Sequence, residues 1–157
     1  MATLPRERPE RMFQRGRPED QEFGLAELLF RRYLRDHWIE GHFSDLGFRF
    51  PRQSLNRQKY SEPEDVLLSD EGTYYNGYGV LEFLVCDIPT TLQAPGTRVF
   101  VFYPRHVPQD LNYAHSELWC DTEHRTGGYI EPKSSIIRKQ LRTKLSQHVS
   151  IRIPASK

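Results

Sequence analysis

Two stretches of the chain repeat apolar residues every three or four positions, the spacing of one face of an α-helix. The first covers residues 24–38, and its apolar positions are Leu25, Leu28, Leu29 and Tyr33 or Phe30. The second starts with Ser134 or Ser135 as its cap and reaches about residue 147, with apolar residues at Ile137, Leu141 and Leu145. The sequence therefore predicts an N-terminal and a C-terminal helix.

Four other segments are short, apolar and bounded by turn residues, as β-strands are. They cover residues 78–88, 99–103, 115–120 and 149–153. Asn76-Gly77 and Pro95-Gly96 are strong turn signals, so we expect the first two segments to pair as antiparallel central strands, joined by a loop at about 89–97. The order of elements predicts an α+β domain with a mostly antiparallel sheet flanked by the two helices.

Residues 42–77 are more polar and give weaker signals. Phe48 and Phe50 alternate briefly, which indicates a loop entering a short strand. Ser61 is placed to cap a short helix with Pro63 in its first turn. Residues 54–60 gather six polar or aromatic side chains around one leucine and form either an exposed loop or a binding surface. On the second interpretation, the partner would contact Asn56, Arg57, Lys59 and Tyr60.

A length of 157 residues suits one domain with a substantial core. Residues 1–21 have few large apolar side chains and interleave arginine with acidic residues, so we expect a flexible tail before a single domain at residues 22–157. An arginine-rich arm that folds on RNA or on a partner is the alternative interpretation.

Charge and cysteine content narrow the function classes. The chain has 22 basic and 21 acidic residues, so no overall positive field favours nucleic acid. Two cysteines, with no apolar run long enough for a bilayer and no secretory signal, predict a cytoplasmic protein away from membranes; a bridge between Cys86 and Cys120 stays open. No phosphate loop, dinucleotide fingerprint or hydrolase motif is present, and no cofactor is expected.

The segment 112–117 carries the best candidate chemistry. If it leads into a strand, His115 and Glu117 share one face, because side chains alternate in a strand. His115 could then act as a general base oriented by Glu117, while Asn112 donates to a developing oxyanion. Alternatively, His115 bonds a backbone carbonyl and Asn112 sets the turn.

Two other patterns have weaker support. His115, Cys120 and His124, with Cys86 from a neighbouring strand, could hold zinc, but no closely spaced cysteine pair supports this and no metal is expected. Arg32 and His37, like Arg142 and His148, match the Arg–His spacing of the HEPN ribonucleases, which are all-helical whereas this chain is strand-rich.

The last predicted helix is basic. Its positive residues could contact RNA or DNA through phosphate groups, or could form a solvated helix face. The candidates for nucleic-acid contact are Lys133, Arg138, Lys139 and Arg142, with Lys144 and Arg152 nearby.

Parts of the chain resemble a group of small uncharacterised prokaryotic proteins that share an Asn-x-Ala-His-x-Glu motif. The similarity rests on residues 54–60, on residues 112–117, and on a final helix and strand ending at Pro154, and covers about residues 37–154. Tyr113 stands where the group has proline. Genes of this group lie among bacterial mobile elements and defence systems, so the resemblance implies a role in a defence assembly without implying a chemistry.

Two functions are expected. The first is a non-catalytic accessory domain that binds a protein partner, within a prokaryotic defence or mobile-element system. The alternative is a metal-independent ribonuclease, with His115 and Glu117 as proton carriers and Arg138 or Arg142 holding phosphate. The ribonuclease requires the last helix to lie beside the strand that carries His115.

Overall fold

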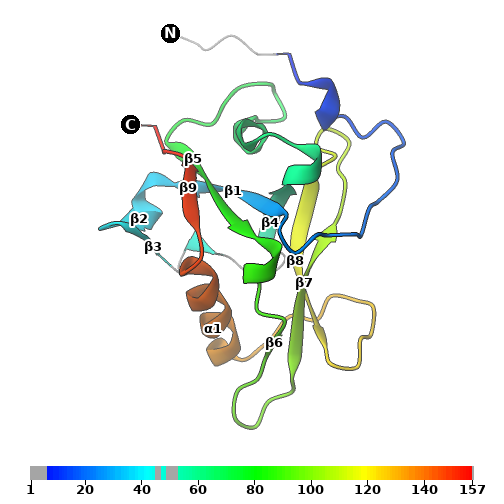
Figure 1. The fold of residues 1–157 in the computed structure, drawn as a ribbon, viewed down its shortest axis with the longest axis vertical. Helices are drawn as coiled ribbons and strands as arrows, with labels where there is room; N and C mark the ends of the chain where they lie inside the picture. Colours follow the sequence, from blue (N-terminus) through cyan, green and yellow to red (C-terminus); the bar gives the residue numbers. More distant parts are fainter. Residues whose placement is uncertain (1–6, 45–46, 49–52, 157) are drawn as a thin grey trace.

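A computed structural model describes residues 7–44, 47–48 and 53–156. A seven-stranded sheet runs through the molecule, and its neighbouring strands all pair antiparallel (Figure 1). This confirms the α+β class with a mostly antiparallel sheet. In spatial order the strands are β6 (Thr91–Leu92), β7 (Phe100–His106), β8 (His115–Thr122), β4 (Gln53–Arg57), β1 (Leu28–Leu34), β5 (Tyr78–Leu84) and β9 (Ser150–Ile153).

The remaining elements are short, apart from one helix. A two-stranded ribbon joins β2 (Trp38–Ile39) to β3 (His42–Phe43). The helix is α1 (Ser135–Ser146), and no helix in the described ranges is both long and apolar enough to cross a bilayer. The 3-10 turns are η1 (Glu10–Met12), η2 (Arg35–His37), η4 (Gln58–Tyr60), η5 (Pro63–Leu67) and η6 (Val85–Asp87).

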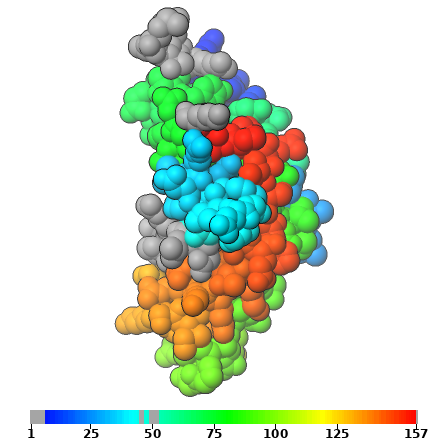
Figure 2. Space-filling view, turned by 90° about the vertical axis from the view of Figure 1, so that its left-hand side faces the viewer, coloured from blue at the N-terminus to red at the C-terminus, as the bar shows by residue number. Residues whose placement is uncertain are grey.

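The C-terminal helix forms as its sequence predicts. The side-chain oxygen of Ser134 accepts a hydrogen bond from the backbone N–H of Ile137, so Ser134 caps α1. Ile137, Leu141 and Leu145 are buried in the main core cluster. The helix covers one face of the sheet, and the β2–β3 ribbon, cyan in Figure 2, lies on the same side of the molecule as the orange helix.

The predicted N-terminal helix at residues 24–38 is wrong, since the described chain forms strand β1 there. β1 lies inside the sheet and is covered on both faces: Leu29 and Tyr33 pack in the main core, while Phe30 packs with Leu67 and Val80 on the other side. A strand buried on both faces carries apolar residues at adjacent positions and loses its two-residue alternation. The resulting pattern matched helical spacing by coincidence.

The expected pairing of residues 78–88 with 99–103 is also wrong. β5 pairs with β1 and β9, whereas β7 pairs with β6 and β8. The turn η6 ends β5, so Pro95-Gly96 joins β7 to the short strand β6 instead. The strands expected near residues 115–120 and 149–153 are confirmed as β8 and β9.

The polar region before β5 differs from its prediction in two ways. Residues 54–57 of the loop expected at 54–60 belong to β4, inside the sheet. The short helix expected after Ser61 is confirmed as the turn η5, but Glu62 is its cap, and the backbone N–H of Glu62 donates to Asp65. The strand expected at Phe48 and Phe50 lies partly outside the described residues.

Residues 7–22 run along the sheet and are called the N-terminal strap here; residues 1–6 of the expected tail lie outside the described residues. Met12 is buried, and its carbonyl accepts from the backbone N–H of Tyr113. Arg11 makes two hydrogen bonds to the buried carboxylate of Asp65, and the Tyr113 hydroxyl donates to the Pro18 carbonyl. Ion pairs and hydrogen bonds thus hold the strap together with the single buried side chain of Met12.

Arg57 anchors the strap from the end of β4. Its side chain is fully buried and pairs with both carboxylate oxygens of Glu27, at 3.0 and 2.8 Å. The same guanidinium donates to the carbonyls of Asp20 and Glu22, each at 2.6 Å, and lies over the ring of Phe23. All these partners precede β1, so one buried cation orders the strap and its connection to the sheet.

His106 makes a second buried contact with the strap. Its Nδ1 accepts from the backbone N–H of Asp20 at 2.9 Å, so its Nε2 carries the proton and donates to the carbonyl of Tyr113. Burial lowers the pKa of His106 below its ordinary value and outweighs the opposing bond to Tyr113. The imidazole is therefore neutral in the folded protein at neutral pH.

This buried histidine should make stability fall in mild acid. Because its pKa is lowered in the folded state, its contribution is complete above the unfolded value of about 6.5 and is lost as pH falls from there through the folded pKa. Urea unfolding between pH 5 and 7.5 should show this slope, and His106→Asn should flatten it. His124→Asn, at an exposed position, is the control; an unchanged slope in His106→Asn would contradict the assignment.

Candidate functional site

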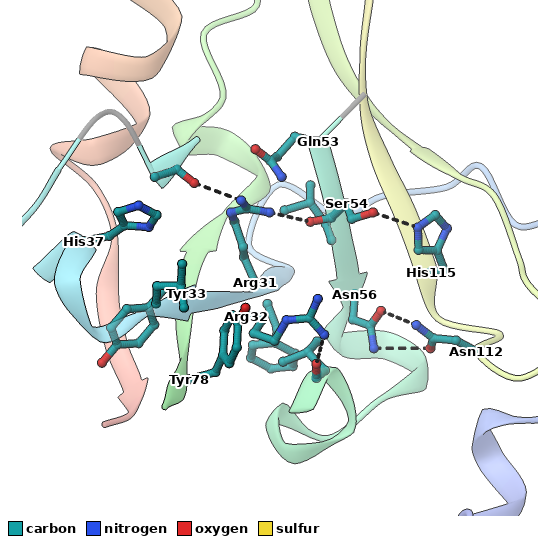
Figure 3. Close-up of a pocket in the computed structure, with 15 residues that line it drawn as sticks. Arg31, Arg32, Tyr33, His37, Gln53, Ser54, Asn56, Tyr78, Asn112 and His115 are labelled. Carbon is teal, nitrogen blue, oxygen red and sulfur yellow. Dashed lines mark hydrogen bonds between the residues drawn. The ribbon is translucent and has the colours of Figure 1, made fainter. Parts of the chain in front are cut away.

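A cleft opens where two strands of the sheet separate. Among the described residues, β1 and β4 share two residue pairs, Leu29 with Arg57 and Phe30 with Asn56. Beyond them β1 continues to pair with β5, and a cavity of about 380 Å³ lies between β1 and β4. We call this cavity the arginine cleft. Its charged or imidazole-bearing lining residues are Arg31, Arg32, His37 and His115, and its neutral polar ones are Gln53, Ser54, Asn56 and Asn112 (Figure 3).

Two consecutive arginines of β1 reach this cleft. They point to opposite faces of the sheet because side chains alternate along a strand, and both line the cavity because β4 has moved away. Arg31 donates to the carbonyl of Gly47 at 2.8 Å and makes a longer contact of 3.4 Å to the Ser54 carbonyl. Arg32 stacks on the ring of Tyr75, with its guanidinium carbon 3.9 Å from the ring centre.

Histidine 115 begins β8 at the opposite wall. Its Nδ1 lies 2.9 Å from the Val107 carbonyl, which only accepts, so Nδ1 carries the proton. Its Nε2 is therefore an acceptor, and the hydroxyl of Ser54 donates to it over 3.1 Å. The bond to a backbone carbonyl is one that the second interpretation of His115 expects, and the contact with Ser54 was not foreseen.

Asn112 is tied to Asn56 by a reciprocal amide pair. Each side-chain NH₂ group donates to the oxygen of the other residue, at 3.2 and 2.7 Å (Figure 3). The carbonyl of Asn112 also accepts from the backbone N–H of His115, which fixes the turn into β8. The pair closes one end of the cleft, and Asn56 is buried rather than available to a partner.

Glu117 lies on the same face of β8 as His115 but does not line the described cleft. Its carboxylate accepts from the indole N–H of Trp119 at 3.2 Å, and Arg105 stacks on that indole. No hydrogen bond links Glu117 to His115 among the described contacts. The expected pairing of these two side chains is therefore not formed, and the Val107 carbonyl orients His115 instead.

The basic residues of the last helix lie on the other side of the sheet. Leu118 and Cys120 of β8 pack in the core with the buried face of α1, so the His115 side chain points to the opposite face. The structure thus does not bring His115 together with the candidates for nucleic-acid contact, Lys133, Arg138, Lys139 and Arg142. Lys133 lines a separate cavity near β7.

Of the four residues expected to contact a partner, Arg57, Lys59 and Tyr60 contact the strap, and Asn56 pairs with Asn112. Asn56 and Arg57 are buried, and Lys59 and Tyr60 both donate to the carboxylate of Asp20, at 2.7 and 2.6 Å. The bond from Lys59, followed by that from Tyr60, lowers the pKa of Asp20 well below its usual range. The same bonds raise the pKa values of Lys59 and Tyr60.

The zinc arrangement is not present among the described residues. No group of three or more histidine, cysteine or acidic side chains is placed there to hold a metal ion. His115 and Cys120 point to opposite faces of β8, and burial raises the pKa of the Cys120 thiol to about 12. Cys86 and Cys120 are both free thiols, so no bridge joins them.

The cleft contains one Arg–His pair noted from its spacing. Arg32 and His37 both line it, although Arg32 lies on a strand rather than a helix. The main residues that sequence reasoning missed are Arg31 and Ser54. Two consecutive arginines inside a strand are the signal for this site, but residues 24–38 were interpreted as a helix, so this signal was missed.

The described lining of the arginine cleft contains no aspartate or glutamate. In a chain with 21 acidic and 22 basic residues, this is a local excess of positive charge. The cleft therefore favours an anion, with neutral amides and hydroxyls around it to accept and donate further hydrogen bonds.

Comparison with known proteins gives no further information on the function of this chain. No family model, curated protein or solved structure was found to match this chain. The similarity to the prokaryotic group with the Asn-x-Ala-His-x-Glu motif thus stays a prediction, and function must be argued from the cleft.

Proposed function

We propose that the protein is a ligand-binding domain whose arginine cleft takes a small anionic molecule bearing a phosphate or carboxylate group. One observation carries the proposal: two arginines line a cavity whose described lining contains no acidic side chain. Guanidinium groups bind phosphate and carboxylate through paired, charge-assisted hydrogen bonds. A volume of about 380 Å³ lies within the range of small-molecule sites.

Arg32 is the residue proposed to hold the anion. Tyr75 and Tyr78 support the flat faces of its guanidinium at 3.9 and 5.1 Å, which leaves the N–H edges directed elsewhere. Its hydrogen bond to the Val66 carbonyl is long, at 3.5 Å. A guanidinium fixed by stacking and weakly engaged at its edge is prepared to bind an anion with little loss of entropy.

The proposal keeps the binding role of the sequence-based expectation and replaces the protein ligand by a small anion. A protein partner and a setting in prokaryotic defence remain predictions from the resemblance. In such an accessory domain, a ligand bound in the cleft would lie beside the Asn56–Asn112 pair at the turn into β8. Binding of the ligand would then be the signal that the domain passes to its partner.

Binding is tested with a matched pair of probes, adenosine 5′-monophosphate and adenosine, which differ only by the phosphate. We expect the nucleotide, and not the nucleoside, to bind in calorimetric titration at low salt. Arg32→Ala should weaken the nucleotide by about 10- to 100-fold, because a hydrogen bond to a charged group contributes about 1.5–3 kcal/mol. Succinate and glutarate serve as carboxylate probes in the same titration.

Arg98→Ala is the matched control, since Arg98 is exposed and lies outside this cleft. It removes the same charge and should leave nucleotide affinity within about twofold, because exposed charges at long range are screened. Equal weakening by both substitutions, or equal binding of nucleotide and nucleoside, would contradict anion recognition in the arginine cleft.

A further inference from the structure

We propose that Ser54 and His115 form a nucleophile–base pair in the arginine cleft and cleave an ester of a carboxylic acid in a molecule that also carries an anionic group. The inference rests on the proposed anion-binding function of the same cleft. It assigns chemistry to Ser54 and gives His115 a partner other than Glu117.

The pair has the geometry that nucleophilic catalysis requires. The Ser54 oxygen lies 3.1 Å from Nε2 of His115, within the range of a nucleophile bonded to its base. The bond from Nδ1 of His115 to the Val107 carbonyl, at 2.9 Å, fixes the tautomer that leaves Nε2 free to accept a proton. A backbone carbonyl thus occupies the orienting position that a carboxylate holds in a full triad.

Ser54 and His115 differ in solvent exposure, as a nucleophile and its base should. Ser54 is exposed and lines the cleft, whereas His115 is only 7% exposed. A substrate can therefore reach the hydroxyl, while the base behind it is held by its two hydrogen bonds. Figure 3 shows Ser54 between His115 on one side and Arg31 on the other.

The reaction has two balanced halves. The Ser54 oxygen attacks the acyl carbon and its proton passes to Nε2 of His115; the bond from the acyl carbon to the leaving oxygen then breaks, and that oxygen takes the proton from His115. Water next attacks the acylated Ser54, gives a proton to Nε2, and releases the acid as Ser54 recovers its proton. Water is the only co-reactant.

Arg31 and Arg32 have different roles in the proposed reaction. One terminal nitrogen of Arg31 lies 3.4 Å from the backbone carbonyl of Ser54, so this cation is held near the main chain of the nucleophile and adds positive potential for the oxyanion of the tetrahedral intermediate, without a hydrogen bond to it. Arg32 holds the anionic group of the substrate, as in binding. An acyl ester without an anionic group should react more slowly because it loses that second contact.

Reactivity of Ser54 is tested first by labelling. A fluorophosphonate probe should modify Ser54 in the folded protein at least tenfold faster than the exposed Ser150, which lies on the edge strand β9, with the sites assigned by peptide mass spectrometry. His115→Asn should remove this difference. Equal labelling of Ser54 and Ser150 in the folded, unsubstituted protein overturns the pair.

A second measurement keeps the test valid if hydrolysis is slow. In a Cys86→Ala background, the new thiol of Ser54→Cys should react with iodoacetamide at a lower pH than an ordinary thiol, whose pKa is about 8.5, because His115 accepts its proton. Ser150→Cys is the control thiol, and His115→Asn should return the profile to the control. Identical profiles for the two new thiols also overturn the pair.

The same thiol separates failure of the pair from failure of anion binding. Iodoacetate is the anionic counterpart of iodoacetamide, so the arginine cleft should favour it at Ser54→Cys relative to Ser150→Cys, and Arg32→Ala should reduce that preference. A histidine-dependent profile without this preference supports the pair and overturns the anionic class of substrate. A preference for iodoacetate without a histidine-dependent pH profile supports anion binding and overturns the Ser54–His115 pair.

Turnover completes the test. The 4-nitrophenyl monoester of succinic acid should be hydrolysed. Ser54→Ala and His115→Asn should each lower kcat/KM by at least about 100-fold. The double variant should show no further loss, because the two residues act as one unit. Glu117→Gln should leave the rate within about twofold. A loss with Glu117→Gln as large as with His115→Asn would restore the expected His115–Glu117 pair and overturn the assignment.

Discussion

Replacing Arg57 with alanine is expected to lower the free energy of unfolding by about 3–5 kcal/mol, the range for removing one partner of a buried ion pair. The side chain is fully buried, and the substitution would leave the Glu27 carboxylate without its charged partner. It would also leave the carbonyls of Asp20 and Glu22 without their bonds from Arg57. The cost is therefore the burial of uncompensated polar groups as well as the loss of an attraction.

Urea unfolding at pH 7 measures this effect, and hydrogen exchange of the N-terminal strap locates it. Amides of residues 12–20 should exchange faster in Arg57→Ala than amides in β5, because the strap loses its anchor before the sheet opens. Arg15→Ala is the control, since Arg15 pairs with Glu10 at the surface and exposed pairs contribute about 1 kcal/mol or less.

A double variant separates the ion pair from the packing around it. In Arg57→Met with Glu27→Leu, apolar side chains replace both charges, so stability should recover by more than about 1 kcal/mol relative to Arg57→Ala. If the double variant is no more stable than Arg57→Ala, the unpaired Glu27 carboxylate is not the main source of the loss. A loss below about 1 kcal/mol in Arg57→Ala would contradict the buried anchor itself.

Arg57 also shows why the N-terminal segment was hard to predict from the sequence. Composition counts apolar area, and residues 1–21 have little of it. The contacts that hold residues 7–22 are made by Arg57, Asp65, His106 and Tyr113, which lie 35 or more positions away in the sequence. Such long-range polar contacts leave no periodic pattern in the segment that they hold.

The element with a clear solvent face, α1, was predictable from its spacing, and the doubly covered strand β1 was not. The four-residue spacing of Ile137, Leu141 and Leu145 predicts α1 correctly because the other face of that helix meets solvent. β1 is covered on both sides, so its apolar residues follow no single period. Pairing partners of strands depend on long-range contacts, and the local turn signal at Pro95-Gly96 could not supply them.

The candidate site was predictable only in part for the same reason. His115 and Asn112 stand out because their residue types are suited to catalysis and lie close together in the sequence. Ser54 comes from another strand, and Arg31 and Arg32 from a third, so their approach to His115 depends on the strand order β8-β4-β1. The cleft itself arises because the described β1–β4 ladder stops after two pairs. No residue of either strand predicts this end of pairing from the sequence.

Leu141→Ala is expected to lower the free energy of unfolding by about 2–5 kcal/mol, the usual cost of truncating a fully buried leucine. Leu141 is the middle of the three α1 residues in the main core, so the cavity would lie between the helix and the sheet. The surrounding helix and strands can collapse only partly into that space, because neighbouring side chains already fill the core.

Ile136→Ala provides the matched comparison in the same helix, because Ile136 is 55% exposed. Alanine is the better helix former, so the second substitution should change stability by less than about 0.5 kcal/mol. Chemical denaturation of both variants measures the difference. Similar losses from both would mean that α1 does not pack on the sheet through its Ile137, Leu141 and Leu145 face, and would remove the basis for placing its basic residues on the opposite side from His115.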